Sequence, residues 1–424
     1  CDSSYHYQLK HLFAFVAVFR EEEKKMRIAH IAPPWISIPP KNYGGTENVI
    51  YHLVEEQVAQ GHSVTLFAPG DTRTSARHIS FFARSLFECG VPWHSHPKAF
   101  YHLYKSVEYL QKHAHDFDIL HAHLSSSSDI YLFPLMATLR LPHVTTLHSQ
   151  FPFDRINDEW RGDADHYYME WLAHAPMVAI SRSAREQEWA KFPVNFIDVV
   201  HHGIDVRDFP SPCEPGDFFA WVGRLIPEKG VHLAIEAAKK ANVPLIIAGI
   251  VDRNIPEAQR YFQEEIEPHI DGQQIQYIGP VCPEERNNLF RRARGFLNPL
   301  LWEEPFGMVM LEAMAVGCPV IAFRRGAVEE LITSDTIGFL VENVNEMAQR
   351  IPALGTIKRN AVRAYVETYF SAARMAENYT RVYQKVILRK QGVAIARLSK
   401  VTEFQRENAP ELPFSSVDIK AKSF

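Results

Sequence analysis

The segment EPFGMVMLE, Glu304–Glu312, is the most informative stretch of the sequence. Pro305 cannot lie inside a helix, because its ring removes an N–H group and clashes with the preceding turn. Gly307 allows the backbone to turn tightly or to approach a ligand closely, and the residues after it are apolar and helix-forming. The pattern predicts a loop that carries Glu304, followed by a helix over Met308–Val316 that carries Glu312 and ends at Gly317.

The start of this predicted helix lies between two glutamates that are eight residues apart. Free N–H groups and the helix dipole at such a start attract phosphate. A carboxylate on either side can accept hydrogen bonds from hydroxyl groups. The segment is therefore typical of a site for a ligand with phosphates between two hydroxyl-bearing ends, and a nucleotide sugar is such a ligand.

The bulk composition indicates an ordinary soluble globular protein. A length of 424 residues predicts two or three domains, and 46% hydrophobic and 22% charged residues are usual values. The net charge of −5 argues against a nucleic-acid-binding protein. The 5 cysteines are scattered, which favours a reducing compartment without structural zinc. We expect a cytoplasmic protein, with peripheral contact at the inner face of a membrane left open.

The order of patterns along the chain predicts an α/β protein with two similar halves. From residue 26, apolar β-branched runs alternate with helical patterns, which indicates parallel sheets with crossover helices. The pattern restarts after a proline-containing linker at residues 205–216. We therefore expect two Rossmann-like, doubly wound domains, residues 26–204 and 217–358, that face a central cleft where their strands end.

The remaining segments flank these domains. Residues 359–390 are predicted to form helices that cross back to the first domain, and residues 391–424 a polar tail. We interpret residues 1–25 as an appended or upstream-translated segment, with Met26 as the native start. An amphipathic anchor is the alternative interpretation, because Leu12–Phe19 is apolar but too short to span a membrane.

Apolar and helical periods predict the individual elements. The expected strands are 27–32, 63–68, 118–123, 143–147, 177–180, 197–201, 218–222, 245–248, 276–278, 295–297, 320–323 and 339–341. The expected helices are 46–60, 101–113, 129–139, 183–190, 231–241, 257–267, 283–292 and 308–316.

Two further groups of residues are candidates for binding an anion. Gly44 and Gly45 follow the first strand and allow a tight turn whose N–H groups can meet a ligand, although a simple capped turn is the alternative. Gly223 precedes Arg224 at the end of a strand in the second half, and Lys229 follows in the same loop. A guanidinium fork and an ammonium charge suit a pyrophosphate. The alternative is that both cations are solvated surface residues.

Histidines and aspartates offer less specific signals. His148 ends a predicted strand at the cleft edge, where it can contact a sugar hydroxyl or a phosphate, or serve only a structural role. The pairs His121/His123 and His201/His202 lack a carboxylate or cysteine at matching ligand spacing. Two Asp-x-Asp pairs, at 116/118 and 163/165, have a pattern that arises by chance in long chains. We therefore expect no metal site.

Together these residues resemble glycosyltransferase family 4, a group of retaining enzymes with the GT-B fold. The resemblance runs from Met26 to about Leu388. Its most specific part is the E-x7-E spacing of Glu304–Glu312 with its sequence context through residue 322. One departure is His202, which stands where the family usually has asparagine before Gly-Ile-Asp. The run Gly44–Glu47 is similar to the branch that contains the avilamycin-pathway transferase.

The resemblance implies a retaining glycosyltransferase of carbohydrate biosynthesis with a nucleotide-diphosphate sugar as donor and no required cofactor. It implies that Arg224 and Lys229 neutralise the diphosphate, that Glu312 holds the ribose, and that Glu304 holds the donor sugar. His148 would meet the transferred sugar. The other donor-binding residues that it implies are Gly44, Gly45, Gly223, Phe306, Gly307, Met308 and Val309.

The acceptor cannot be identified from these patterns; a sugar, a lipid-linked glycan and a natural product all remain open, whereas a nucleic-acid partner is not expected. Acceptor contacts are expected in the loops 33–43, 81–99 and 151–166, which carry the aromatic residues Trp35, Tyr43, Trp93, Phe151, Phe153 and Trp160.

Three other functions remain as alternatives. A sugar phosphorylase or a nucleotide-sugar epimerase can share the fold, and a non-catalytic nucleotide-sugar-binding protein can share the site. A dinucleotide-dependent oxidoreductase is disfavoured, because no G-x-G-x-x-G follows the first strand.

Overall fold

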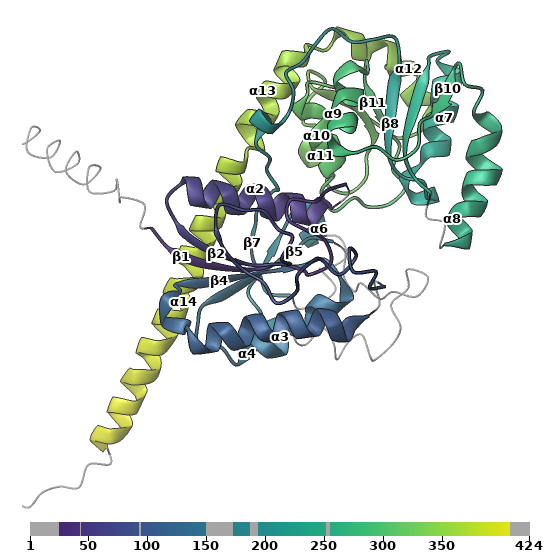
Figure 1. Ribbon diagram of the computed structural model, residues 1–424. Coiled ribbons are helices and arrows are strands. Elements are labelled where there is room, and N and C mark those ends of the chain that lie inside the picture. The colour runs from purple at the N-terminus through teal and green to yellow at the C-terminus, as the bar shows by residue number, and fades with distance from the viewer. Residues whose placement is uncertain are drawn as a thin grey trace, which may run out of the picture.

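The computed structural model describes residues 25–42, 44–92, 95–149, 173–186, 194–251 and 255–407, with side chains described as far as residue 392. They form two α/β lobes joined by a short segment, with a long helix that returns from the second lobe to the first (Figure 1). Most of the segment at residues 1–25, which we interpreted as appended, lies outside the described residues.

The first lobe is built on a 7-stranded parallel sheet with the order β3-β2-β1-β4-β5-β6-β7. Its strands are β1 (Arg27–Ile31), β2 (Ser63–Phe67), β3 (Arg77–Ile79), β4 (Ile119–Leu124), β5 (His143–Leu147), β6 (Met177–Ala179) and β7 (Phe196–Val199). Its helices are α2 (Gly45–Ala59), α3 (His96–Lys112), α4 (Leu132–Ala137) and α6 (Arg182–Glu186).

The second lobe is built on a 6-stranded parallel sheet with the order β10-β9-β8-β11-β12-β13. Its strands are β8 (Phe219–Arg224), β9 (Leu245–Ile250), β10 (Ile275–Tyr277), β11 (Phe296–Asn298), β12 (Val320–Phe323) and β13 (Gly338–Val341). Its helices are α7 (Val231–Lys240), α8 (Pro256–Tyr261), α9 (Pro283–Arg292), α10 (Met308–Ala315), α11 (Val328–Leu331) and α12 (Val344–Arg350).

The strand orders explain where a ligand can bind. In the first sheet the order reverses between β1 and β4, and in the second between β8 and β11. Parallel α/β sheets bind ligands outside the carboxyl ends of the strands at such a reversal. Gly44 follows β1, Arg224 ends β8, and Glu304 follows β11, so these predicted residues lie on loops at the two reversals.

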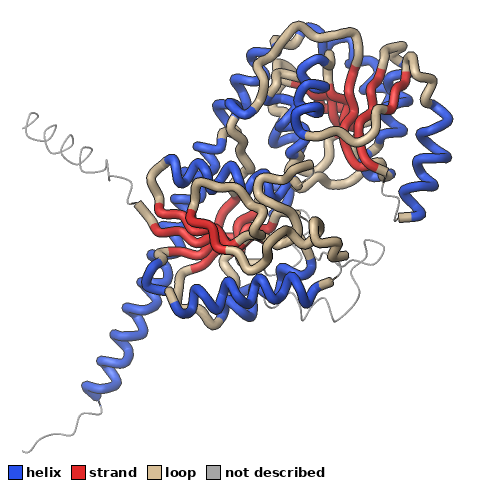
Figure 2. The backbone as a smooth tube through the Cα atoms, viewed as in Figure 1, coloured by secondary structure: helices blue, strands red, loops and turns tan. Residues whose placement is uncertain are grey.

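Every predicted strand is present, which confirms the two Rossmann-like sheets; Figure 2 shows both sheets flanked by helices. The prediction missed β3, because the short edge segment Arg77–Ile79 is half polar and lacks an apolar run. The prediction of one continuous helix over residues 129–139 was wrong. The structure has a 3-10 turn at Ser127–Tyr131 followed by α4.

Helices α13 (Arg359–Tyr369) and α14 (Ala372–Glu407) connect the lobes. Apolar residues of α14, among them Tyr379 and Tyr383, are buried against the first sheet and α2 together with Ile28, Val49 and Leu53. The predicted crossover is therefore present. The expectation of a tail from residue 391 is corrected, because α14 continues as a helix to Glu407.

Arg363 of α13 ties the crossover to the segment between the lobes. Its guanidinium donates hydrogen bonds to the carbonyl oxygens of Val206 at 2.6 Å, Phe209 at 3.2 Å and Pro210 at 3.1 Å. A further hydrogen bond of 2.8 Å reaches the carbonyl of Ala315 at the end of α10. One side chain thus satisfies carbonyl groups of both the connecting segment and the helix that carries Glu312.

Replacement of Arg363 should therefore destabilise the protein. We expect Arg363→Met to lower the free energy of unfolding by about 2 kcal/mol, because several carbonyl groups lose a charged donor. Urea unfolding measures this, with Arg381→Met as the control, since Arg381 is exposed and, among the described residues, its guanidinium bonds only Asn378 of its own helix. Equal stability of the two variants would contradict this account of the crossover.

Candidate functional site

Gly307 fixes the start of α10. Its φ of 102° lies in the left-handed region, and a Cβ atom there would come within 2.2 Å of the Met310 Cε atom. Only glycine meets both conditions without strain. The helix therefore begins at Met308, as predicted, and the N–H groups of Met308 and Val309 have no acceptor in the described part of the chain.

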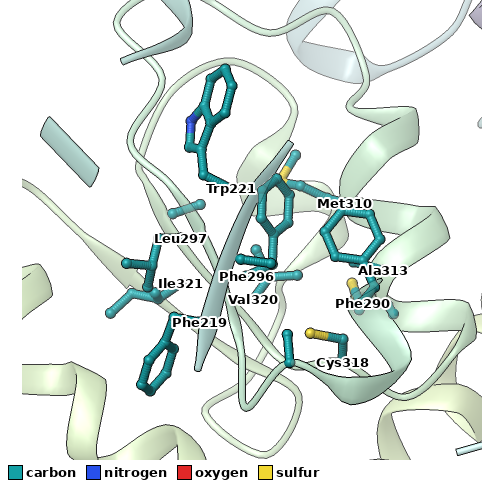
Figure 3. Packing of buried hydrophobic residues seen from close by; sticks show 14 of the residues in the cluster. Phe219, Trp221, Phe290, Phe296, Leu297, Met310, Ala313, Cys318, Val320 and Ile321 are labelled. Carbon is teal, nitrogen blue, oxygen red and sulfur yellow. The ribbon is translucent and has the colours of Figure 1, made fainter. Parts of the chain in front are cut away.

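The apolar face of α10 is held by the core of the second lobe. Met310 and Ala313 are buried, and Figure 3 shows them packed beside Phe290 of α9 and Phe296 of β11. The rings of Phe290 and Phe296 are 4.9 Å apart. This packing fixes the rotation of the short helix about its axis, and thereby the position of Glu312.

Glu304 is held by two residues of its surroundings. Lys229 Nζ lies 2.9 Å from Glu304 Oε2, and Trp302 Nε1 donates to the same oxygen at 3.0 Å. The Lys229 ammonium also lies 4.2 Å from the centre of the Trp302 ring, a cation–π contact. Both polar contacts use Oε2, so no described residue donates to Glu304 Oε1.

Glu312 is held in a similar way. Arg286 of α9 forms an ion pair of 3.0 Å with Glu312 Oε1, and Asn48 of α2 donates to the same oxygen at 3.4 Å. Burial raises the pKa of Glu312, and the charge of Arg286 opposes that rise. The Asn48 contact joins the two lobes, while Glu312 Oε2 receives no hydrogen bond from a described residue.

The loop after β8 packs directly on the loop that leads to Glu304. Leu301 N donates to the carbonyl of Glu228 at 2.9 Å, and a Cβ on Gly230 would come within 1.9 Å of the Pro299 oxygen. The predicted Lys229 and Glu304 are thereby brought together. Arg224 is exposed at the end of β8, and its guanidinium has no hydrogen-bond or ion-pair partner among the described residues.

Gly44 and Gly45 lie at the first-lobe side of the same region. Gly44 precedes α2 and Gly45 is its first residue, so the glycines stand about one turn before Asn48. A Cβ on Gly44 would come within 2.8 Å of Glu47 Oε2 and of Pro40 Cβ, which leaves no room for a side chain. The structure thus brings α2 and its glycine turn to α10, because Asn48 contacts Glu312.

A second set of contacts joins the lobes through the loop before α10 and through α11. Ser181 Oγ donates to the Pro305 carbonyl at 2.7 Å. Glu330 of α11 accepts hydrogen bonds from Arg182 N at 3.0 Å and Ser183 N at 2.8 Å, and His201 Nε2 lies 2.6 Å from it. Burial alone would raise the pKa of Glu330, but these hydrogen bonds together lower it to about 2.

His148 lies directly after β5, at the carboxyl end of the first sheet. Its Nε2 is 2.9 Å from His123 Nδ1, and its ring stacks on His202 with 5.1 Å between the ring centres. The His202 ring in turn meets Phe306 of the second lobe edge-on at 4.9 Å. Burial lowers the pKa of His148 to about 3, so its imidazole is neutral at physiological pH.

His30, His121 and His123 place ring nitrogens within 4.8 Å of one another, a spacing that could suit a metal ion. Every ring nitrogen of the three already has a hydrogen-bond partner in Gln57, Thr146, Tyr383, His148 or another member of the group. A metal ion would have to displace these bonds. Of the Asp-x-Asp pairs, Asp118 pairs with Arg27 at 2.8 Å, and residues 163 and 165 lie outside the described residues.

The loops expected to bind the acceptor are described only in part. Trp35 is buried, and its Nε1 donates to Ser128 Oγ at 3.3 Å, so it packs within the first lobe. The other aromatic candidates, Tyr43, Trp93, Phe151, Phe153 and Trp160, lie outside the described residues.

Known protein families match both lobes. Residues 43–208 match the family described as Glycosyltransferase Family 4, and residues 208–359 match Glycosyl transferases group 1. The chain is a glycosyltransferase with a family 4 domain followed by a group 1 domain. A phosphatidyl-myo-inositol mannosyltransferase of Mycobacterium leprae is 23% identical to this glycosyltransferase over 88% of the chain and 100% of the relative.

Solved structures show the same GT-B fold for this glycosyltransferase. AviGT4, a glycosyltransferase of avilamycin A biosynthesis, superimposes with a TM-score of 0.63 at 20% identity, over 86% of this chain and 98% of AviGT4. Anabaena Alr3699/HepE in complex with UDP and glucose superimposes with a TM-score of 0.62 at 17% identity, over 85% and 99% of the two chains.

Within the described residues, none of the helices of this glycosyltransferase has the length and apolar character needed to span a membrane.

The contacts of Glu330 predict an acid-dependent stability. The pKa of Glu330 in the folded protein is about 2, below its ordinary value of 4.5. The stability that its ionised carboxylate contributes is therefore complete above pH 4.5 and is lost as the pH falls toward 2. Urea midpoints measured from neutral pH down to about pH 3 should fall less steeply for Glu330→Gln than for the wild type. Glu329→Gln is the control, since Glu329 is exposed; parallel curves for Glu330→Gln and the wild type would refute the assignment.

Proposed function

We propose that this glycosyltransferase moves a sugar from a nucleotide-diphosphate donor to an acceptor hydroxyl, with retention of configuration at the anomeric carbon. The observation that carries the proposal is the similar arrangement of contacts around the carboxylates of Glu304 and Glu312. Each carboxylate has one oxygen held by a cation and a second donor, while the other oxygen receives no hydrogen bond from a described residue. Two fixed acceptors on either side of the α10 start suit hydroxyl groups at the two ends of one donor.

The diphosphate is proposed to lie between these carboxylates. The N–H groups of Met308 and Val309 are without acceptors among the described residues, and the helix dipole adds a partial positive charge beside them. The Arg224 guanidinium is exposed and has no partner among the described residues. Lys229 carries three N–H donors, so its ammonium can bind Glu304 and a phosphate oxygen at the same time. Gly44 and Gly45 are proposed to line the phosphates from the first lobe.

The proposed chemistry is stabilisation of a leaving group. As the bond from the sugar to the diphosphate breaks, negative charge grows on the phosphate oxygen, and fixed cations stabilise that charge most in the transition state. In a front-face attack the departing oxygen takes the proton of the acceptor hydroxyl, so no separate base is required. Glu312 is proposed to hold the ribose, Glu304 the donor sugar, and His148 to contact the transferred sugar.

The known proteins support the donor class. Anabaena HepE, which shares the fold, holds UDP and glucose in its crystal structure. The mycobacterial relative is a phosphatidyl-myo-inositol mannosyltransferase by name. The acceptor of this chain is proposed only as a hydroxyl compound, of which a lipid-linked acceptor at a membrane surface is one candidate.

Binding and turnover test this function together. In a thermal-shift panel of UDP, GDP, ADP and their hexose conjugates, one nucleotide series should stabilise the protein, by about 2.7 kcal/mol at 100 times its dissociation constant. With that donor, Arg224→Ala and Lys229→Ala should each slow sugar transfer or donor hydrolysis about 10²- to 10³-fold. Glu312→Ala should mainly weaken donor binding.

Arg294→Ala is the control, because Arg294 is an exposed cation just before β11 begins, at the opposite end of that strand from the site. Transfer by Arg224→Ala at the wild-type rate would remove the assignment of that residue. Epimerisation or phosphorolysis of the donor without any transfer would replace the proposed reaction by one of the alternatives.

A further inference from the structure

A chain of buried imidazoles runs beneath His148 and is not used by the proposed chemistry. It consists of His123 of β4, His30 of β1 and the side-chain amide of Gln57 on α2, all at most 1% exposed. His148 Nε2 lies 2.9 Å from His123 Nδ1, and His123 Nε2 lies 3.0 Å from His30 Nδ1. His30 Nε2 lies 2.8 Å from Gln57 Oε1.

These imidazoles are neutral, because burial lowers the pKa of His30 to about 4, that of His148 to about 3 and that of His123 well below its ordinary value. A neutral imidazole has one nitrogen that donates and one that accepts. In a chain of such rings, the direction of one hydrogen bond therefore dictates the direction of all the others.

Gln57 sets that direction. Its Nε2 donates to the Tyr383 hydroxyl at 3.1 Å, so its Oε1 accepts from His30 Nε2–H. His30 Nδ1 must then accept from His123 Nε2–H, and His123 Nδ1 from His148 Nε2–H. The last ring nitrogen, His148 Nδ1, is left with a lone pair.

A lone pair on His148 Nδ1 is consistent with its surroundings, because this atom is buried and has no hydrogen-bond partner among the described residues. The reversed chain would leave an N–H group unpaired at the same place. A buried orphan N–H is rarer and less favourable than an acceptor with an unused lone pair. The ring also stacks on His202, which contacts Phe306, so the chain ends where the first lobe meets the segment Glu304–Glu312.

We propose that Gln57, His30 and His123 are positioning residues that hold His148 in the Nε2–H tautomer, so that Nδ1 accepts a hydrogen bond from a hydroxyl group of the donor sugar. This inference rests on the proposed function for its ligand, although the tautomer itself does not. A lone pair repels an anionic oxygen, so the chain selects a sugar hydroxyl rather than a phosphate as the partner of His148.

Nitrogen-15 NMR of the histidine rings tests the tautomer directly. In the wild-type protein, His148 should show a protonated Nε2 and an unprotonated Nδ1. Gln57→Glu should keep this pattern, because a carboxylate can only accept from His30. Gln57→Met removes the acceptor at similar volume and should give a mixture of tautomers. A protonated Nδ1 in the wild type, or an unchanged pattern in Gln57→Met, would overturn the proposal.

Calorimetric titration tests the consequence for the sugar, with UDP-glucose, GDP-mannose and ADP-glucose each compared with its free nucleoside diphosphate. Gln57→Met should reduce the affinity gained from the sugar about two- to tenfold, the worth of one hydrogen bond, and leave diphosphate affinity unchanged. Gln57→Glu should retain the gain.

Gln60→Met is the matched control, because Gln60 is in the same helical segment but bonds Glu56 and the Ala373 carbonyl instead of the imidazoles. An equal loss of sugar and diphosphate affinity in Gln57→Met would indicate a merely structural role and overturn the proposal. Failure of the wild type to bind any of these nucleotides would contradict the proposed function, while the NMR result would still decide the tautomer.

Discussion

The abrupt start of α10 at Gly307 is the constraint on which the site depends. The left-handed backbone of Gly307 separates an irregular loop from a helix within one residue, and any residue with a side chain would be strained at this φ of 102°. As a result, Glu304 stays on the loop, Glu312 lies on the helix, and two helical N–H groups face outward between them. Contacts from Lys229 and Arg286 then fix the two carboxylates.

The two lobes meet on this same helix. Asn48 contacts Glu312 on the helix, and Ser181 contacts the Pro305 carbonyl in the loop before it. Arg363 binds both the connecting segment and the end of α10. A ligand at the start of α10 would therefore touch the element through which the lobes contact each other.

Local patterns in the sequence were sufficient for every strand except β3 and for the segment Glu304–Glu312, because the spacing of apolar residues, Pro305 and Gly307 act within a few residues. The expectation that strand ends meet placed Lys229 near Glu304, but it did not predict their ion pair. Arg286, Asn48 and Glu330 were missed, because their partners are distant in sequence and no local pattern distinguishes them from other polar residues. The histidines were noticed, but their hydrogen-bonded order depends on Gln57, which carries no signal of its own.

The most direct test of the account is the affinity of Gly307→Ala for the nucleoside diphosphate, among UDP, GDP and ADP, that stabilises the wild type most. A methyl group at this position should shift the start of α10 and misdirect its N–H groups. Calorimetry should show binding at least tenfold weaker than in the wild type, while cooperative unfolding is retained. Wild-type affinity in the folded variant would contradict the claim that this helix start binds the diphosphate.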